Sequence, residues 1–474
     1  MKRYYILALA LAFSVCSVQS APPSQPSSES KLPPPISSFI AAKEKHAQML
    51  AEKLKLKVHD DYWTFFRQAR GGDWLAADRT YESLRKRIFQ DEESKNDPRF
   101  DRTVWQTVVE VSMVLEAYTP TNNASKWSTA FGEGIVKSIP RGSIYFGGTV
   151  TGQGLPTAFS KSHADGDPFF TLTQSALADG HYLDYIRVTY GGKIQTPSKE
   201  DSQRCHQAYL ADAQKRLEHD TKYPNEPRQL RPGEDVGMVD NKVQVSGQVA
   251  IIAIKSLLAK VIFDNNAERE FYVEESFPFD WMYPHLTPHG FIMKINRDPI
   301  SSLSPEVVSK DHEFWTKQQA AMIGDWLKAE TPVSEVCDFV EKVFLKKDLA
   351  GFRGDTAFVR SDFTTKMYSK LRCSIAGVYN WRIANSSSPE EQQRMIKEAD
   401  YAFRQSFAFC PVSPEAVFRY VNLLVQLVRI DDALLIARTA ARLKPKDPQL
   451  QNLITELERI RGLNPKVILP GQTP

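Results

Sequence analysis

Hydrophobic residues recur at steps of three and four along most of the chain, which is the spacing of an amphipathic helix. Between residues 37 and 140 this pattern predicts a helical hairpin domain. One apolar stripe follows a glycine-containing turn at 71–73 and consists of Trp74, Ala77, Tyr81 and Leu84. The turn and the stripe together predict two helices that pack against each other.

The pattern changes after Pro140, where short apolar runs alternate with helical stretches. Strands are predicted at 143–146, 168–173, 270–274 and 291–295. Strands that alternate with helices favour a parallel sheet with helices on its faces. We therefore predict a central α/β domain at 141–300, mostly parallel and Rossmann-like, with a charged insertion near 200–235. Residues 249–263 are apolar nearly all round, which predicts a buried helix.

Helical periodicity returns after the α/β domain. We predict a helical connector at 301–362, helical repeats at 363–460 and a tail at 461–474. The repeats are indicated by four residue pairs that are each 34 positions apart, namely Ala399/Ala433, Phe403/Ala437, Ser406/Ala440 and Pro411/Pro445. A shared offset of this length is typical of stacked helical hairpins, which bind other molecules.

The N-terminal residues predict export. Lys2 and Arg3 precede an apolar run, and small residues follow it, which is typical of a signal peptide at 1–20. Lipidation at Cys16 and an uncleaved anchor are the alternatives. Residues 21–36 are rich in Pro and Ser and predict a linker. No later run approaches the roughly 20 apolar residues of a spanning helix. We therefore expect a periplasmic or extracellular protein without a spanning helix after signal cleavage.

Charge and cysteine content exclude several classes of function. The chain has 60 basic and 57 acidic residues, and this near balance argues against nucleic acid as a partner. The cysteines beyond the signal are far apart, so neither a zinc knuckle nor a thioredoxin-type motif is present. They are Cys205, Cys337, Cys373 and Cys410. A disulfide formed in an oxidising compartment and four buried thiols both remain open.

A glycine-rich segment at 147–154 is the best candidate for a ligand site. It follows a predicted strand and precedes a predicted helix, where backbone N–H groups and the helix dipole favour anions. The candidate binding residues are Gly147, Gly148, Thr149, Gly152 and Gly154. The segment lacks the Lys-Ser or Lys-Thr of a phosphate loop and the last small residue of a dinucleotide fingerprint. A tight structural turn is the alternative.

Two groups of polar residues have the composition of metal sites. His163, Asp165 and Asp167 lie close together, but the ligand series of a calcium loop does not continue, which favours a solvated turn. His285 and His289 have the spacing of zinc ligands on a helix. Prolines beside both histidines argue against a continuous helix there. We therefore predict no metal site.

One carboxylate pair and one aromatic segment complete the candidates. Glu274 and Glu275 are adjacent on a predicted strand, so their side chains are expected on opposite faces and not to act together. Aromatic residues alternate over 277–283, which suits an extended segment that stacks on sugar rings or peptide, or one that belongs to the core. We predict no catalytic residue and no cofactor.

The repeated positions resemble the tetratricopeptide repeat. The matching residues are Ala399, Phe403, Ser406, Pro411, Tyr420, Leu424, Ala433, Ala437, Ala440 and Pro445. Val417, Val421 and Val428 depart from the repeat at the positions of its Trp, a small residue and its turn Gly. The resemblance implies a concave helical surface that binds protein or peptide.

A longer block resembles the soluble C-terminal region of uncharacterised bacterial membrane proteins, which are themselves similar to protein O-mannosyltransferases. It includes residues 143–178, Phe271-Tyr272-Val273-Glu274-Glu275-Ser276 and Trp281-Met282-Tyr283-Pro284. In those relatives chemistry is expected in the membrane-spanning part, which this chain lacks, so no catalytic residue carries over. The resemblance implies an exported partner or accessory protein that takes part in cell-envelope glycan or polymer metabolism.

Two functional hypotheses follow from the sequence. The first is a non-catalytic scaffold that uses tetratricopeptide-like helices to bind a protein or peptide, or a glycan, in the cell envelope. The alternative is an enzyme that handles envelope glycan or sugar phosphate, or an accessory to a glycosyltransferase, acting through the glycine-rich segment.

Overall fold

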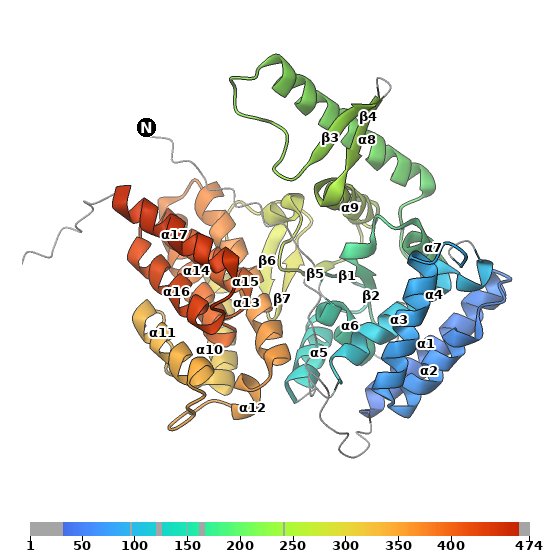
Figure 1. Cartoon of the computed structure of the whole chain (residues 1–474), viewed down its shortest axis with the longest axis horizontal. Coiled ribbons are helices and arrows are strands. Elements are labelled where there is room, and N and C mark those ends of the chain that lie inside the picture. Colours follow the sequence, from blue (N-terminus) through green and yellow to red (C-terminus); the bar gives the residue numbers. More distant parts are fainter. Residues whose placement is uncertain are drawn as a thin grey trace, which may run out of the picture. The chain divides into compact units, whose positions relative to one another are not determined.

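The computed structural model describes residues 32–94, 97–119, 126–148, 150–160, 166–239 and 242–463. The predicted signal peptide, most of the linker and nearly all of the tail lie outside these ranges. The chain divides into two compact units, each built from separate segments (Figure 1). Unit 1 comprises Met1–Val108 and Thr173–Glu268, and unit 2 comprises Val109–Leu172 and Arg269–Pro474. This division differs from the predicted boundaries because each unit joins segments that are distant in the sequence.

Unit 1 is mainly helical. Its first segment contains α1 (Pro34–Lys53), α2 (Asp60–Gly71), α3 (Trp74–Phe89), η1 (Pro98–Phe100) and the start of α4 (Arg102–Glu116). Its second segment contains η2 (Gln174–Ala176), α7 (Gly180–Tyr190), α8 (Lys199–Lys222), β3 (Asp235–Val239), β4 (Lys242–Ser246) and α9 (Gly247–Asn265).

The helical hairpin predicted around residue 72 is confirmed. Helix α2 ends at Gly71 and is capped by Gly72, whose φ of 75° is the left-handed conformation that glycine adopts readily. Helix α3 begins after Asp73, whose carboxylate accepts a hydrogen bond of 3.1 Å from the Ala76 N–H. The two helices pack together.

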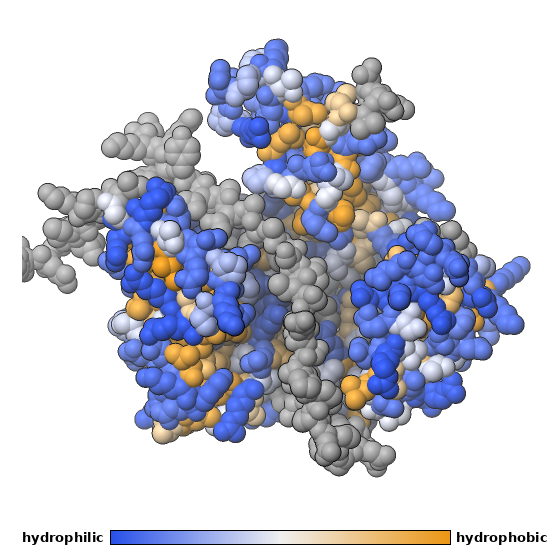
Figure 2. All heavy atoms as spheres, viewed as in Figure 1, coloured by the Kyte–Doolittle hydropathy of each residue, from blue (hydrophilic) through white to orange (hydrophobic). Residues whose placement is uncertain are grey.

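Helix α9 is less buried than its composition predicts. Ile251, Ile252 and Leu257 are exposed by 39%, 47% and 36%. The antiparallel strands β3 and β4 pack on α8 and α9, and Met238 of β3 is exposed as well. Hydrophobic residues therefore reach the surface over β3, β4 and α9 (Figure 2). The predicted burial holds only for the second half of the helix.

Unit 2 combines a small sheet with many helices. Around the sheet lie α5 (Lys126–Ser138), β1 (Ile144–Gly147), α6 (Val150–Phe159), β2 (Phe170–Thr173), β5 (Phe271–Glu274), η3 (Asp280–His285), β6 (Leu286–His289) and β7 (Ile292–Ile295). The helical part contains α10 (Pro305–Ile323), α11 (Val333–Val340), η4 (Glu341–Leu345), α12 (Thr356–Val359), α13 (Asp362–Asn385), α14 (Pro389–Phe409), α15 (Pro414–Gln426), α16 (Ile430–Leu443) and α17 (Pro448–Leu463).

The sheet of unit 2 has the strand order β2-β1-β5-β7-β6. Strands β1 and β5 are parallel, whereas β5 and β7, and β6 and β7, are antiparallel. The sheet is therefore mixed, and the mostly parallel arrangement that we predicted is not observed. The reason is the β6–β7 hairpin, which turns at Gly290 with a φ of 62°. A short turn of this kind joins antiparallel strands, and Pro288 is tolerated because β6 lies at the sheet edge.

The helices predicted in the C-terminal part are present. Helix α13 packs on α14, α15 on α16, and α16 on α17. Small residues permit close approach of α13 and α14, where the Ser369 and Ser406 hydroxyl oxygens lie 3.0 Å apart. Among the ten repeat positions, only Pro445 is exposed. The recurring small and aromatic residues therefore form the contacts between helices.

Candidate functional site

One face of α13, the first helix of the predicted repeats, packs on the sheet and is not open to a partner. Helix α13 contacts β6 and β7. The Arg382 guanidinium donates hydrogen bonds of 2.7 and 3.2 Å to the carbonyls of Ile300 and Pro284, and Trp381 stacks on Tyr283 with ring centroids 5.9 Å apart. Segments of the same chain thus occupy the surface that a partner would otherwise use. Tyr283 of the aromatic segment 277–283 belongs to this packing.

The opposite side of the helical hairpins is covered as well. Helix α11 contacts both α14 and α16. Arg404 donates a hydrogen bond to the Thr331 carbonyl, and Arg442 forms an ion pair with Glu341. Other segments of unit 2 therefore cover part of the hairpin surface.

Close packing accounts for two glycines of the glycine-rich segment. A Cβ at Gly147 would lie 2.8 Å from Gln153 Cα, and a Cβ at Gly154 would lie 3.3 Å from the Met113 backbone. These glycines let α6 approach β1 and α4. The Tyr145 hydroxyl donates a hydrogen bond to the Gly152 carbonyl. Thr149 lies outside the described residues, and anion binding by the segment stays a prediction.

The structure brings the Glu275 carboxylate against Gly148. A Cβ at position 148 would clash with Glu275 Oε2, and the Gly148 N–H donates a hydrogen bond of 2.7 Å to the Glu274 carbonyl. Glu275 Oε1 in turn accepts hydrogen bonds of 2.6 and 3.3 Å from the N–H groups of Ser276 and Phe277. In its ionised form this carboxylate would repel an anion beside the glycines.

The two adjacent carboxyl groups influence each other, which the sequence argument did not predict. Two causes, first burial and then the neighbouring charge of Glu274, together raise the pKa of Glu275 to about 7. Strand β5 ends at Glu274, so the alternation of side chains along a strand does not extend to position 275. A carboxyl group with this pKa exchanges protons near neutral pH.

The candidate metal ligands have other partners. A ring nitrogen of His285 lies 2.8 Å from the Asn296 carbonyl, and one of His289 lies 2.8 Å from the Ser138 carbonyl. Asp167 forms an ion pair with Arg141, whereas positions 163 and 165 lie outside the described residues. Across the described ranges, no group of three or more His, Cys, Asp or Glu side chains is arranged to hold a metal ion.

Each cysteine of the described residues is a buried thiol without a disulfide. Burial raises the pKa of Cys337 to about 12 and that of Cys410 to about 11, and it also raises the pKa values of Cys205 and Cys373. Since the thiolate is the reactive form, these side chains are chemically inert in the folded protein. The two alternatives were a disulfide and four buried thiols, and the structure contains the four buried thiols.

A hollow of about 570 Å³ opens in unit 2 beside α11. Three half-buried rings line it, those of Trp326, Phe339 and Phe352. Trp326 stacks on Phe339 with centroids 4.5 Å apart, and Phe352 lies 6.3 Å from Phe339. We call this site the α11 hollow. It was not predicted from the sequence, because the three rings are far apart in the chain and form no motif.

A π-helical turn shapes one wall of the α11 hollow. Helix α11 continues into η4 (Glu341–Leu345), which is followed by Lys347 in the left-handed conformation, with a φ of 55°. Such turns contain an extra residue and often occur at functional sites. The Lys342 ammonium donates a hydrogen bond of 2.7 Å to the Ala350 carbonyl, which ties η4 to the segment that carries Phe352.

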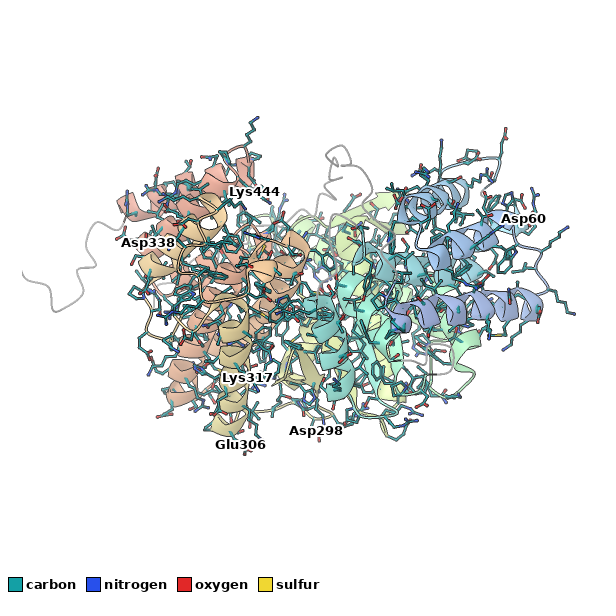
Figure 3. All side chains as sticks on the ribbon, turned by 90° about the horizontal axis from the view of Figure 1, so that it is seen from below. Asp60, Asp298, Glu306, Lys317, Asp338 and Lys444 are labelled. Atoms are coloured by element: carbon teal, nitrogen blue, oxygen red, sulfur yellow. The ribbon has the colours of Figure 1, made fainter. Side chains whose placement is uncertain are left out.

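Carboxylates surround the rings of the α11 hollow. Asp325 lies 3.8 Å from Arg353, and Asp348 lies 3.9 Å from Lys342. Each ring residue is adjacent in sequence to a charged residue, as in Asp325-Trp326, Asp338-Phe339 and Phe352-Arg353. This adjacency is the one sequence signal that indicates the hollow. Figure 3 shows Asp338 at the surface of unit 2.

Comparisons with known protein families, with curated proteins and with solved structures gave no match for this chain. The two family resemblances inferred from the sequence therefore stay predictions. Within the described ranges, no helix has the length and apolar character needed to cross a membrane.

Proposed function

We propose that this protein is a non-catalytic binding protein that holds a segment of a partner protein or peptide in the α11 hollow. The observation that carries the proposal is the hollow itself, with three stacked or neighbouring rings on its walls. Its volume of about 570 Å³ is typical of ligand pockets. Rigid aromatic side chains supply large contact area at low entropic cost, which is why they dominate binding sites.

The polar residues around the hollow support binding rather than catalysis. Glu335 and Asp338 are exposed on α11. General acids and bases are usually held in buried positions that shift their proton affinity. Exposed carboxylates around an aromatic floor instead orient a bound ligand.

Two expectations from the sequence, export of the protein and its tetratricopeptide-like repeats, are part of this proposed function. In it, the signal-like residues 1–20 direct the protein to the cell envelope, and helices α13 to α17 are tetratricopeptide-like hairpins. The common offset of the residues that pack between these helices supports the second point. The hairpins then support the site, and the partner binds beside α11 rather than on α13.

Of the predicted Rossmann-like architecture, we retain in this proposal only the turn between β1 and α6.

Binding of the purified full chain to a peptide array tests this function. We expect retained peptides to lose binding when Trp326→Ala removes the ring from the hollow. The matched control is Trp63→Ala, which removes another half-buried indole, from α2 in unit 1. Thermal unfolding of both variants verifies that they are folded. The proposal is contradicted if the array retains no peptide, or if both folded variants lose peptide binding equally.

A second candidate function rests on Glu275. In this proposal the chain handles envelope glycan or sugar phosphate, or assists a glycosyltransferase, beside Gly148. The pKa of about 7 at Glu275 supports it, because such a group exchanges protons at neutral pH. The hydroxyl of Ser276 is also buried, and no residue that the structure describes forms a hydrogen bond with it. Thermal-shift measurements with nucleotide sugars and polyprenyl-phosphate analogues should then show stabilisation that Glu275→Gln abolishes. No shift across that panel contradicts this candidate.

A further inference from the structure

Two carboxylates of the α11 hollow have no ion-pair partner among the residues that the structure describes. They are Glu335 and Asp338, which lie three residues apart on α11 and therefore on the same face. In a regular α-helix, Lys342 at i+4 would be placed to pair with Asp338. Here Lys342 belongs to the π-helical turn and donates to the Ala350 carbonyl instead. The turn thus leaves the charge of Asp338 available.

The hollow carries a surplus of negative charge. Its lining includes four carboxylates and two basic side chains, so two negative charges remain. The carboxylates are Asp325, Glu335, Asp338 and Asp348, and the basic side chains are Lys342 and Arg353. A phosphate or another anion would be repelled from this site. A cation would be attracted both by the carboxylates and by the negative faces of the rings.

None of the cationic side chains that the structure describes lies over the rings of the hollow. Although Lys342 and Arg353 line the hollow, neither lies over Trp326, Phe339 or Phe352 in the described part of the chain. Elsewhere in unit 2 such contacts do form, as between Arg372 and the Trp315 ring at 5.3 Å. The aromatic faces of the hollow are thus left for a cation from outside.

We propose that the α11 hollow receives a lysine or arginine side chain from an extended segment of the partner, over its rings and against Glu335 and Asp338. This inference rests on the proposed binding function and specifies its ligand chemistry. The rings contact the apolar stem and the cationic head, while the carboxylates form ion pairs at the rim. The combination selects basic segments over neutral or acidic ones.

Isothermal titration of the purified full chain with a tetra-arginine peptide tests the inference. The reference ligand is tetra-citrulline, which has nearly the same shape without charge. We expect tetra-arginine to bind about tenfold more tightly. Raising the ionic strength from about 0.05 M to about 0.5 M should weaken this binding, because salt screens exposed charges. Equal binding of the two peptides would overturn the inference.

Variants that remove charge test whether Glu335 and Asp338 are the carboxylates that bind tetra-arginine. The double variant Glu335→Gln/Asp338→Asn should weaken tetra-arginine binding about fivefold to tenfold. The matched control, Asp298→Asn/Glu306→Gln, removes the same charge from exposed positions of unit 2 that lie away from Asp338 (Figure 3). It should retain wild-type affinity. Equal losses in the two double variants would overturn the inference.

A third variant separates the rings from the carboxylates. Trp326→Leu keeps an apolar side chain and removes the indole face, and it should weaken tetra-arginine binding several-fold. If array peptides depend on Trp326 while tetra-arginine and tetra-citrulline bind alike, the binding function stands and the cationic ligand is wrong. If array peptides bind independently of Trp326, the proposed function itself fails.

Discussion

The Glu275 carboxylate lies in the space that a side chain at Gly148 would occupy. The register of the parallel strands β1 and β5 explains this position, because Gly147 is paired with Glu274 and the residues that follow each strand meet at the same edge. The Gly148 N–H also donates to the Glu274 carbonyl. A glycine and a half-buried acid are thereby linked across more than a hundred residues of sequence.

Replacing Gly148 with alanine should destabilise the protein. The new methyl group must displace Glu275 and its hydrogen bonds to the backbone, at a cost of about 1–3 kcal/mol. Urea unfolding measures the change in the free energy of unfolding. Gly462→Ala on α17 is the control, because nothing lies within 4 Å of the new Cβ there. Similar free energies for the two variants would contradict the close contact.

The raised pKa of Glu275 predicts a pH dependence of stability. The folded-state value of about 7 exceeds the ordinary value of 4.5, so the folded protein holds this proton more tightly than the unfolded chain. Stability should therefore fall as pH rises from about 5 to 8, by about 3 kcal/mol from this group.

Glu275→Gln removes this titration and should raise the free energy of unfolding at pH 8 relative to wild type. Urea unfolding between pH 5 and 8 measures the slope. The control Glu458→Gln removes an exposed carboxylate on α17 and should keep the wild-type slope. An unchanged slope in Glu275→Gln would show that this carboxyl group does not titrate in that range.

The buried ion pair between Arg372 and Asp311 should be costly to break. The two side chains are 2.7 Å apart and fully buried, and Asp311 also accepts a hydrogen bond of 2.7 Å from the Tyr379 hydroxyl. Arg372→Met leaves the carboxylate without its counter-ion and should destabilise by about 3–5 kcal/mol.

Chemical denaturation of Arg372→Met tests this value against a surface pair. Arg438→Met breaks the exposed pair between Arg438 and Glu458 and should change stability by less than about 1 kcal/mol. The double variant Arg372→Met/Asp311→Leu should recover part of the loss, because no unpaired charge remains. Equal effects of Arg372→Met and Arg438→Met would refute a strong buried pair.

The four cysteines of the described residues should resist alkylation in the native state. Burial excludes reagent and keeps the thiols protonated, as the raised pKa values of Cys337 and Cys410 indicate. Mass spectrometry after maleimide treatment should detect modification of these positions only in denaturant. Rapid modification of Cys373 in the native protein would contradict its burial.

Local patterns predicted most of the helices. The turn at Gly72 and the stripe that begins at Trp74 specify a hairpin, because left-handed geometry and helical spacing are properties of short segments. Helix α9 shows the limit of the same reasoning. Its composition predicts burial, but exposure depends on what packs against it, and Ile252 in its first half remains 47% exposed.

The candidate site was less predictable than the helices. The glycine-rich segment was found because glycines are conspicuous in a sequence, and packing now accounts for Gly147 and Gly154. The α11 hollow was missed because Trp326, Phe339 and Phe352 come together only through a π-helical turn and a loop. Neither element has a distinctive local pattern.

The sequence by itself determined that most of these segments are helical, and it indicated which residues of the C-terminal hairpins pack between neighbours, because hydrophobic spacing acts over a few residues. Tertiary structure alone decided three further features: the mixed sheet, the covering of α13 by β6 and β7, and the meeting of Gly148 with Glu275. These depend on contacts between residues far apart in the chain, which follow from how the whole unit buries its apolar surface rather than from any local pattern.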